Sequence, residues 1–328
     1  MAEITVLGAG GWGIALALTA YRSGHKVNLW TKFEDEAVAL RRDEEHKKLL
    51  PGVYIPKDIN ITTDLSVIKD NEMVIIAVPS FAVEQTAMDI SGIISATTII
   101  TNVAKGFADD EGTRLSEIIK KYNSNNPVTV LSGPTHAEEV AHNKPCSIVS
   151  ACEDMSVAER VQKLLMSDTF RIYVNTDVIG VELCGAFKNV MALAAGISDG
   201  MGFGDNTKAA LMTRGMYEMS LIGEAFGAER TTYYGLAGMG DLIVTCGSMH
   251  SRNRRAGILI GEGMSAADAV KRIGTVEGYF ATKSAYLISK KYGVDMPITE
   301  QCYKICYENL DPKDAIKKLM GRSGKAEQ

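Results

Sequence analysis

Two isolated charges in the second half of the sequence could carry proton chemistry. Lys188 is the one ionisable side chain of residues 185–198, and Asp241 is the one formal charge of residues 233–251. Both stretches are otherwise apolar or glycine-rich, and a buried ammonium without a partner is costly and gives up its proton more readily. We therefore expect the two side chains to form an ion pair that takes part in proton transfer. A lysine that reaches water and an aspartate that caps a helix are the structural alternatives.

Three arginines follow the acidic member of this pair. Arg252, Arg254 and Arg255 lie in the segment SRNRRAG. A nucleic-acid surface is disfavoured, because the formal net charge of the chain is -5 and no aromatic residues are interleaved with the arginines. Guanidinium groups bind phosphate through charge-assisted hydrogen bonds, so the segment predicts a small phosphorylated ligand. Since neighbouring arginines cannot all face one ligand, we expect one or two of them to be surface charges.

A glycine-rich loop near the N-terminus predicts a dinucleotide site. Gly8, Gly10 and Gly13 form a G-x-G-x-x-G pattern between a predicted strand at 3–7 and a predicted helix at 12–23. The three glycines permit a tight turn, close approach of a pyrophosphate and close helix packing. The N-terminus of the helix then favours the anion. In this context the loop predicts binding of a nicotinamide dinucleotide.

Residues at the ends of two further predicted strands bear on cofactor and substrate. An NAD-selective site usually has an acid about 20 residues after the glycine loop, but this sequence has Trp30, Thr31 and Lys32 there. A cation without an acid favours a ribose 2′-phosphate, so we expect NADP to be accepted, while the preference between NADP and NAD stays open. Lys105 follows the apolar strand predicted at 98–103, which places it at the edge of the sheet where ligands bind.

The elements that would position these residues divide the chain of 328 residues into two parts. Up to residue 177, short runs rich in Val, Ile and Thr alternate with amphipathic stretches; after it, strand signals nearly vanish. The sequence thus predicts an α/β fold: a Rossmann-type, mostly parallel sheet domain over 1–177, an all-helical substrate domain over 178–328, and a cleft between them. The expected strands are 3–7, 26–30, 73–78, 98–103, 128–131, 147–151 and 171–174. The expected helices of the second part are 178–198, 206–227, 265–273, 280–291, 297–308 and 312–320.

Composition argues against several other classes of protein. Six cysteines without a CxxC pair indicate reduced thiols in a cytoplasmic protein. The five histidines show no metal-binding spacing, so no metal is expected. No apolar run approaches the roughly 18 residues of a membrane helix, so no membrane span is expected. The oligomeric state is open, and a homodimer is one of the assemblies considered.

Longer motifs carry a resemblance to one enzyme family. In order and spacing, the chain from about residue 3 to 320 resembles the bacterial NAD(P)-dependent sn-glycerol-3-phosphate dehydrogenases at GAGGWGIALA, NVAKGF, SGPTHA, GAFKNVMALAAGIS, GDNTKAAL, GLAGMGDLIVTCGSMHSRNRRAG and TVEG. The resemblance implies reversible hydride transfer between NAD(P)H and dihydroxyacetone phosphate. The product would be sn-glycerol 3-phosphate, which the family supplies for phospholipid synthesis.

The resemblance also implies roles for single residues. Lys188, Lys105 and Asp241 would form the catalytic set, with Lys188 as the general acid/base and Lys105 reaching both cofactor and substrate. The other implied cofactor contacts, besides the loop glycines, are Gly11, Trp12, Lys32, Ala137, Arg252, Thr275 and Glu277. The other implied substrate contacts are Gly133, Thr135, Ser251, Arg252 and Asn253. His136 replaces the usual phenylalanine of the family, which leaves the wall of the cleft and the pH dependence open.

Two other functions stay open from the sequence alone. A related two-domain dehydrogenase could act on a hydroxy acid, with a substrate carboxylate in place of phosphate at Arg252. A non-catalytic NAD(P)H-sensing protein would bind the dinucleotide without turnover. The second alternative gives no reason for the isolated charges of Lys188 and Asp241.

Overall fold

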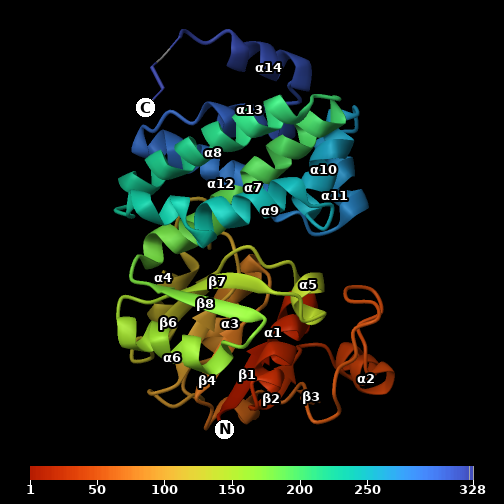
Figure 1. The fold of residues 1–328 in the computed structure, drawn as a ribbon, viewed down its shortest axis with the longest axis vertical. Coiled ribbons are helices and arrows are strands. Elements are labelled where there is room, and N and C mark those ends of the chain that lie inside the picture. Colours follow the sequence, from red (N-terminus) through yellow and green to blue (C-terminus); the bar gives the residue numbers. More distant parts are fainter. Residues whose placement is uncertain (325, 328) are drawn as a thin grey trace. The chain divides into compact units, whose positions relative to one another are not determined.

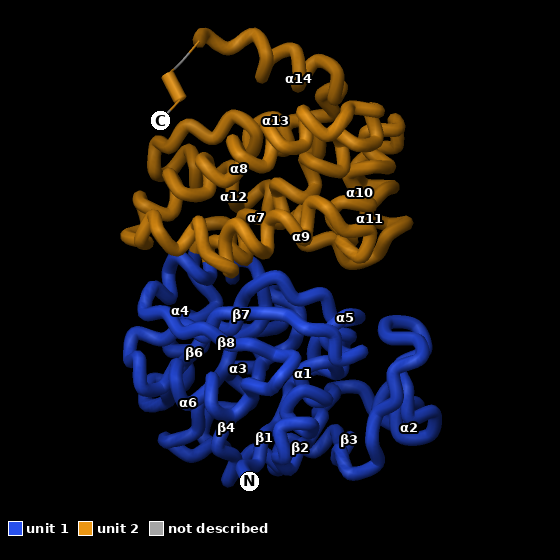
Figure 2. The backbone as a smooth tube through the Cα atoms, in the orientation of Figure 1, with its two compact units in different colours: residues 1–108, 113–182 blue, residues 109–112, 183–328 orange. Residues whose placement is uncertain are grey.

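The chain forms two compact units, which are coloured separately in Figure 2. A computed structural model describes residues 1–324 and 326–327. The sheet unit comprises Met1–Ala108 and Thr113–Glu182, and the helical unit comprises Asp109–Gly112 and the chain from Leu183 onward. Helix α7 (Val178–Gly200) contributes residues to both units. The domain boundary at residue 177 stays a prediction.

The sheet unit is built on one eight-stranded sheet with the order β3-β2-β1-β4-β5-β6-β7-β8 (Figure 1). All neighbouring strands pair in parallel except β6 and β7, which are antiparallel. The strands are β1 (Glu3–Leu7), β2 (Lys26–Trp30), β3 (Asn60–Thr62), β4 (Met73–Ile76), β5 (Ile99–Asn102), β6 (Val128–Ser132), β7 (Cys146–Ala151) and β8 (Phe170–Asn175). The predicted α/β fold class and mostly parallel sheet are confirmed. Strand β3 was not predicted, because its residues are few and carry no apolar run.

Helices cover both faces of this sheet. Side chains of α1 (Gly11–Arg22), α5 (Ala137–Ala141) and α6 (Met155–Leu165) share one apolar cluster with strand residues. Side chains of α3 (Val83–Ile90) and α4 (Leu115–Tyr122) share another. Strands buried on both sides must be apolar throughout, as the fully buried sequence MVII of β4 illustrates. The remaining helix of the unit, α2 (Glu34–Asp43), follows β2 directly.

In its described part, the helical unit contains helices and turns but no strand, as the sequence predicted. Its helices after α7 are α8 (Asp205–Ala225), α9 (Asp241–Gly247), α10 (Arg252–Gly261), α11 (Ala266–Ile273), α12 (Glu277–Tyr292), α13 (Pro297–Tyr307) and α14 (Pro312–Met320). Helices α9 and α10 were not predicted. Helix α10 crosses α7 at backbone contact distance: a Cβ on Gly196 would overlap the carbonyl oxygen of Arg254, and one on Gly257 would overlap that of Leu193. Only glycine fits at this crossing.

Helix α7 corrects one statement made from the sequence. It has 23 residues and a mean hydropathy of 1.5 over its most apolar window, so it is long and apolar enough to cross a membrane. The expectation that no apolar run approaches this length was wrong, because Glu182 and Lys188 were read as interruptions although such a helix tolerates isolated charges. Within the structure, 94% of that window is buried inside the protein. The helix thus satisfies its apolar surface as a core element.

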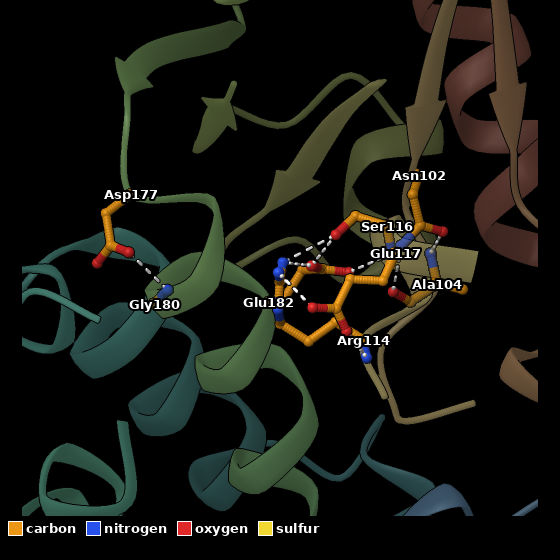
Figure 3. A network of polar contacts seen from close by, with 8 residues as sticks. All are labelled: Asn102, Ala104, Arg114, Ser116, Glu117, Asp177, Gly180 and Glu182. Atoms are coloured by element: carbon orange, nitrogen blue, oxygen red, sulfur yellow. Dashed lines mark hydrogen bonds and ion pairs between the residues drawn. The ribbon is translucent and has the colours of Figure 1, made fainter. Parts of the chain in front are cut away.

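A buried ion pair lies in the sheet unit where α7 begins (Figure 3). The carboxylate of Glu182 accepts hydrogen bonds from the guanidinium of Arg114 and from the backbone N–H of Ser116, each at 2.9 Å. The hydroxyl of Ser116 donates to the same carboxylate. Ser116 lies in the first turn of α4, so the negative charge also faces the N-terminus of that helix. The side chains of Arg114 and Glu182 are 14% and 6% exposed, which makes the pair an interior one.

A second buried carboxylate predicts a pH dependence of stability. Glu218 of α8 accepts hydrogen bonds from the backbone N–H groups of Ile298 and Thr299 at the start of α13. Burial raises the pKa of Glu218 to about 7, although these donors oppose the rise. The folded chain therefore holds a proton that the unfolded chain releases between its ordinary pKa of 4.5 and about 7. In this window the free energy of unfolding falls as pH rises.

Glu218→Gln is expected to remove this dependence, because the amide cannot ionise and its oxygen can still accept from α13. Urea unfolding at two pH values measures the effect. The stability of the variant minus that of the parent protein should increase by roughly 2 kcal/mol from about pH 5 to about pH 7.5. An equal difference at both pH values would contradict the assignment.

Candidate active site

The glycine loop has the backbone geometry that a dinucleotide needs. Gly8 has φ +115°, and a Cβ there would lie 2.8 Å from the carbonyl oxygen of Ala77. A Cβ on Gly13 would overlap the carbonyl oxygen of Gly8, so the loop and α1 approach each other as only glycines allow. Around Gly10, by contrast, nothing lies within 4 Å of the missing side chain. The loop therefore leaves open space at the position where a pyrophosphate would approach.

The N-terminus of α1 lies directly behind this loop. In the described chain no side chain caps the helix, and its first turn contains no acidic residue. Its first N–H groups, on Gly11 and Trp12, thus face a region that suits an anion. A Cβ on Gly11 would lie 3.7 Å from the Cβ of Ala137, so two of the implied cofactor contacts are neighbours. These residues could hold a dinucleotide.

The carboxyl end of β2 carries a cation and no acceptor for a ribose hydroxyl. Lys32 is exposed there, while the nearest acids belong to α2. One of them, Glu36, accepts the hydroxyl proton of Thr31. Phe33, which the sequence analysis did not single out, follows with 66% of its surface exposed. An exposed aromatic ring at a strand end can stack on a base, and its position next to Lys32 could have signalled this.

The ends of β5 and β6 bring three implied substrate contacts together. The ammonium of Lys105 donates to the carbonyl oxygen of Gly133 at 3.3 Å. The hydroxyl of Thr135 donates to the same oxygen at 3.2 Å. The two strands pair in parallel, so their carboxyl ends meet at one edge of the sheet. Within the sheet unit this edge holds the half-buried cation nearest to the proposed chemistry.

The helical unit joins the two isolated charges. The ammonium of Lys188, on α7, lies 2.6 Å from the carboxylate of Asp241, the first residue of α9. The ammonium also donates to the hydroxyl of Thr245 at 2.8 Å, and that hydroxyl donates to the backbone oxygen of Asp241 at 2.5 Å. Lys188 is 6% exposed and Asp241 1%. The predicted ion pair is confirmed, and neither side chain takes the alternative of reaching water.

Two polar residues beside this pair were missed from the sequence. Thr245 follows Asp241 by one helical turn, and that i, i+4 spacing was a signal that could have revealed it. Asn189 follows Lys188 directly, and its side-chain nitrogen is buried without an acceptor among the described residues. A buried donor without a partner is costly and points to a bound group. Its amide oxygen accepts a hydrogen bond of 2.9 Å from Asn253.

The basic segment divides by function of each side chain. Arg252 is exposed at the first position of α10, and in the described chain no acceptor pairs with it. Ser251 caps α10 by accepting the N–H of Arg254 at 3.2 Å. Asn253 is buried, and its amide oxygen accepts the N–H of Gly278 at 2.9 Å. The arginine available to an anion is therefore Arg252.

The last implied cofactor contacts lie at the start of α12. Thr275 is exposed two residues before the helix, and Glu277 is its first residue. Their roles stay predictions. Over the described residues, no group of three or more His, Cys, Asp or Glu side chains could hold a metal ion.

Two sequence profiles of one family match this chain. The profile described as NAD-dependent glycerol-3-phosphate dehydrogenase N-terminus matches residues 3–158, and the one described as its C-terminus matches residues 177–317. The chain belongs to the NAD-dependent glycerol-3-phosphate dehydrogenase family. The resemblance carried by the motifs is thereby confirmed.

Similar members of the glycerol-3-phosphate dehydrogenase family span the whole chain. The glycerol-3-phosphate dehydrogenase [NAD(P)+] of Thermoanaerobacter sp. (strain X514) is 49% identical over 99% of this chain and 98% of its own length. The protein of the same name from Desulfitobacterium hafniense (strain Y51) is 46% identical over 100% of this chain and 93% of its own. A crystal structure of glycerol-3-phosphate dehydrogenase from Coxiella burnetii is 38% identical, with a TM-score of 0.93 over 98% of this chain and 99% of that one.

Proposed function

We propose that this protein catalyses reversible hydride transfer between NAD(P)H and dihydroxyacetone phosphate, giving sn-glycerol 3-phosphate for glycerophospholipid synthesis. The observation that carries the proposal is the buried contact of Lys188 with Asp241 and Thr245, in a chain that belongs to this family. A binding protein without turnover gives no reason to bury an ammonium and a carboxylate side by side.

Lys188 is the general acid of the reduction. When bound, the reduced nicotinamide supplies a hydride to C2 of the substrate, and Lys188 gives its proton to the C2 oxygen as negative charge develops there. In the reverse direction the neutral amine takes the proton from the hydroxyl. Asp241 and Thr245 fix the direction of the amine through the contacts described above. Burial favours the neutral amine and the carboxylate favours the ammonium, so the two act in opposite directions on the proton.

The remaining residues bind and orient. Arg252 offers a guanidinium to the substrate phosphate, with Ser251 and Asn253 beside it, and Lys105 is assigned to the substrate and the cofactor together with Gly133 and Thr135. Asn189 adds a buried donor next to Lys188. The loop glycines Gly8, Gly10 and Gly13, with Gly11, Trp12 and Ala137, hold the dinucleotide. Lys32 accepts a 2′-phosphate, and Thr275 and Glu277 complete the cofactor contacts.

Location and assembly are part of the same proposal. We place the enzyme in the cytoplasm, which the six free cysteines support. A homodimer is the proposed assembly, and its mass in solution tests it.

A nicotinamide absorbance assay tests the reaction. Dihydroxyacetone phosphate should be reduced with NADH and with NADPH, and α-keto acids should not. Turnover of a keto acid in preference to dihydroxyacetone phosphate would assign the protein to the hydroxy-acid alternative. Binding of NADPH without oxidation on any of these substrates would support a sensing protein.

Arg252→Ala is expected to weaken substrate binding. A charge-assisted hydrogen bond is worth about 1.5–3 kcal/mol, so KM for dihydroxyacetone phosphate should rise roughly 10- to 100-fold. Arg272→Ala provides a control, because Arg272 is an exposed arginine of the same unit in the last turn of α11. An unchanged KM in Arg252→Ala would remove Arg252 from the phosphate site.

A further inference from the structure

Arg254 has a set of contacts quite different from those of its neighbour Arg252. Its guanidinium lies 2.7 Å from the carboxylate of Asp199, near the end of α7. It also donates to the carbonyl oxygen of Gly247, the last residue of α9, at 2.8 Å. Lys208 of α8 binds the other carboxylate oxygen of Asp199 at 2.7 Å. The sequence offered only a ligand or a surface charge for such an arginine, and with 13% of its side chain exposed Arg254 is neither.

These contacts link the helices that carry the proposed chemistry. Helix α9 bears Asp241 and Thr245, and helix α10 begins with Arg252. Only four residues, 248–251, connect the two helices. The guanidinium of Arg254 spans this connection, because it holds the end of α9 from a position in the first turn of α10. It also fixes both to α7 through Asp199.

The proton-transfer group has independent support. Lys188 and Asp241 join α7 to the start of α9 by their own ion pair. The glycine crossing holds the middle of α10 against α7. What neither contact fixes is the short connection that places Arg252. The link from Arg254 to Gly247 is the contact that does so.

We propose that Arg254 is a positioning residue for the substrate's phosphate: by joining Gly247 to Asp199 it sets the place of Arg252 without touching the substrate itself. This inference rests on the proposed function. Loss of the link displaces the anion-binding guanidinium but leaves the proton donor in place. A guanidinium is required, since one ammonium cannot reach a carboxylate and a carbonyl in two directions.

The test compares Arg254→Ala, Arg254→Lys and Lys208→Met in the full-length enzyme. Because small displacements of a binding group are costly, Arg254→Ala should raise KM for dihydroxyacetone phosphate by about tenfold or more. Its kcat should stay within about threefold of the parent value, which is the pattern expected when ground-state binding is lost. Arg254→Lys should keep the pair with Asp199, remain folded, and show an intermediate KM. Lys208→Met removes a cation from the same carboxylate but leaves the link to Gly247, so its KM should hardly change.

Several results would overturn the inference. A merely structural arginine would lower the melting temperature and the active fraction while KM stayed at the parent value. An equal rise of KM in Lys208→Met would assign the effect to the charge cluster rather than to the link with Gly247. Full rescue by lysine would show that the guanidinium geometry is not needed. Failure of the parent enzyme to reduce dihydroxyacetone phosphate would instead reject the proposed function, so the two failures are distinguishable.

Discussion

Lys188→Met should lower turnover of dihydroxyacetone phosphate by about 10²–10⁴-fold, the range that general acid catalysis supplies. The methionine side chain fills similar space but has no proton to give. The dinucleotide should still bind, because the glycine loop and the start of α1 lie in the sheet unit and make their own contacts. Steady-state kinetics and fluorescence titration with NADPH measure the two effects.

Removal of the lysine leaves Asp241 buried without its counter-charge, so stability must be controlled. The double variant Lys188→Met/Asp241→Asn restores neutrality while turnover should stay low. Lys208→Met serves as the matched lysine control, since Lys208 is also ion-paired on a helix of the same unit. If the folded Lys188 variants kept turnover within about tenfold of the parent, general acid catalysis by Lys188 would be rejected.

The ion pair of Lys188 and Asp241 could be predicted because each charge is isolated in an apolar segment. Burial of one charge demands the other, and this demand is visible without coordinates. Thr245 escaped notice because a threonine in a helix is ordinary. Its role depends on the hydroxyl facing Lys188, and helix α9 itself was not predicted. Which of three adjacent arginines faces an anion is likewise set by helix packing, so Arg252 and Arg254 could not be told apart.

Most elements of the fold could be predicted because their signals are local. The strands of the parallel sheet are short apolar runs, and the amphipathic helices between them repeat at the helical period. Helix α10 was missed for a physical reason: Gly257 and Gly261 disfavour an isolated helix. The close crossing with α7 compensates for this cost, and such a crossing exists only in three dimensions.

The ion pair of Arg114 and Glu182 was not singled out from the sequence, yet it should dominate the stability of the sheet unit. Arg114→Met leaves the Glu182 carboxylate buried with Ser116 as its remaining printed donor. Breaking a buried pair on one side costs about 3–5 kcal/mol, so the free energy of unfolding should fall by that amount. Urea denaturation followed by circular dichroism measures the loss.

Two further variants separate the burial of the charge from the loss of contacts. The double variant Arg114→Met/Glu182→Gln should recover much of the stability, because the uncompensated charge is gone while the amide can still accept from Ser116. Lys26→Met breaks the pair with Glu3, whose two side chains are 63% and 31% exposed, and should cost roughly 0–1 kcal/mol. Equal losses in Arg114→Met and Lys26→Met would show that water reaches the Glu182 carboxylate. The penalty depends on the carboxylate being held away from solvent at the N-terminus of α4, where only Arg114 neutralises it.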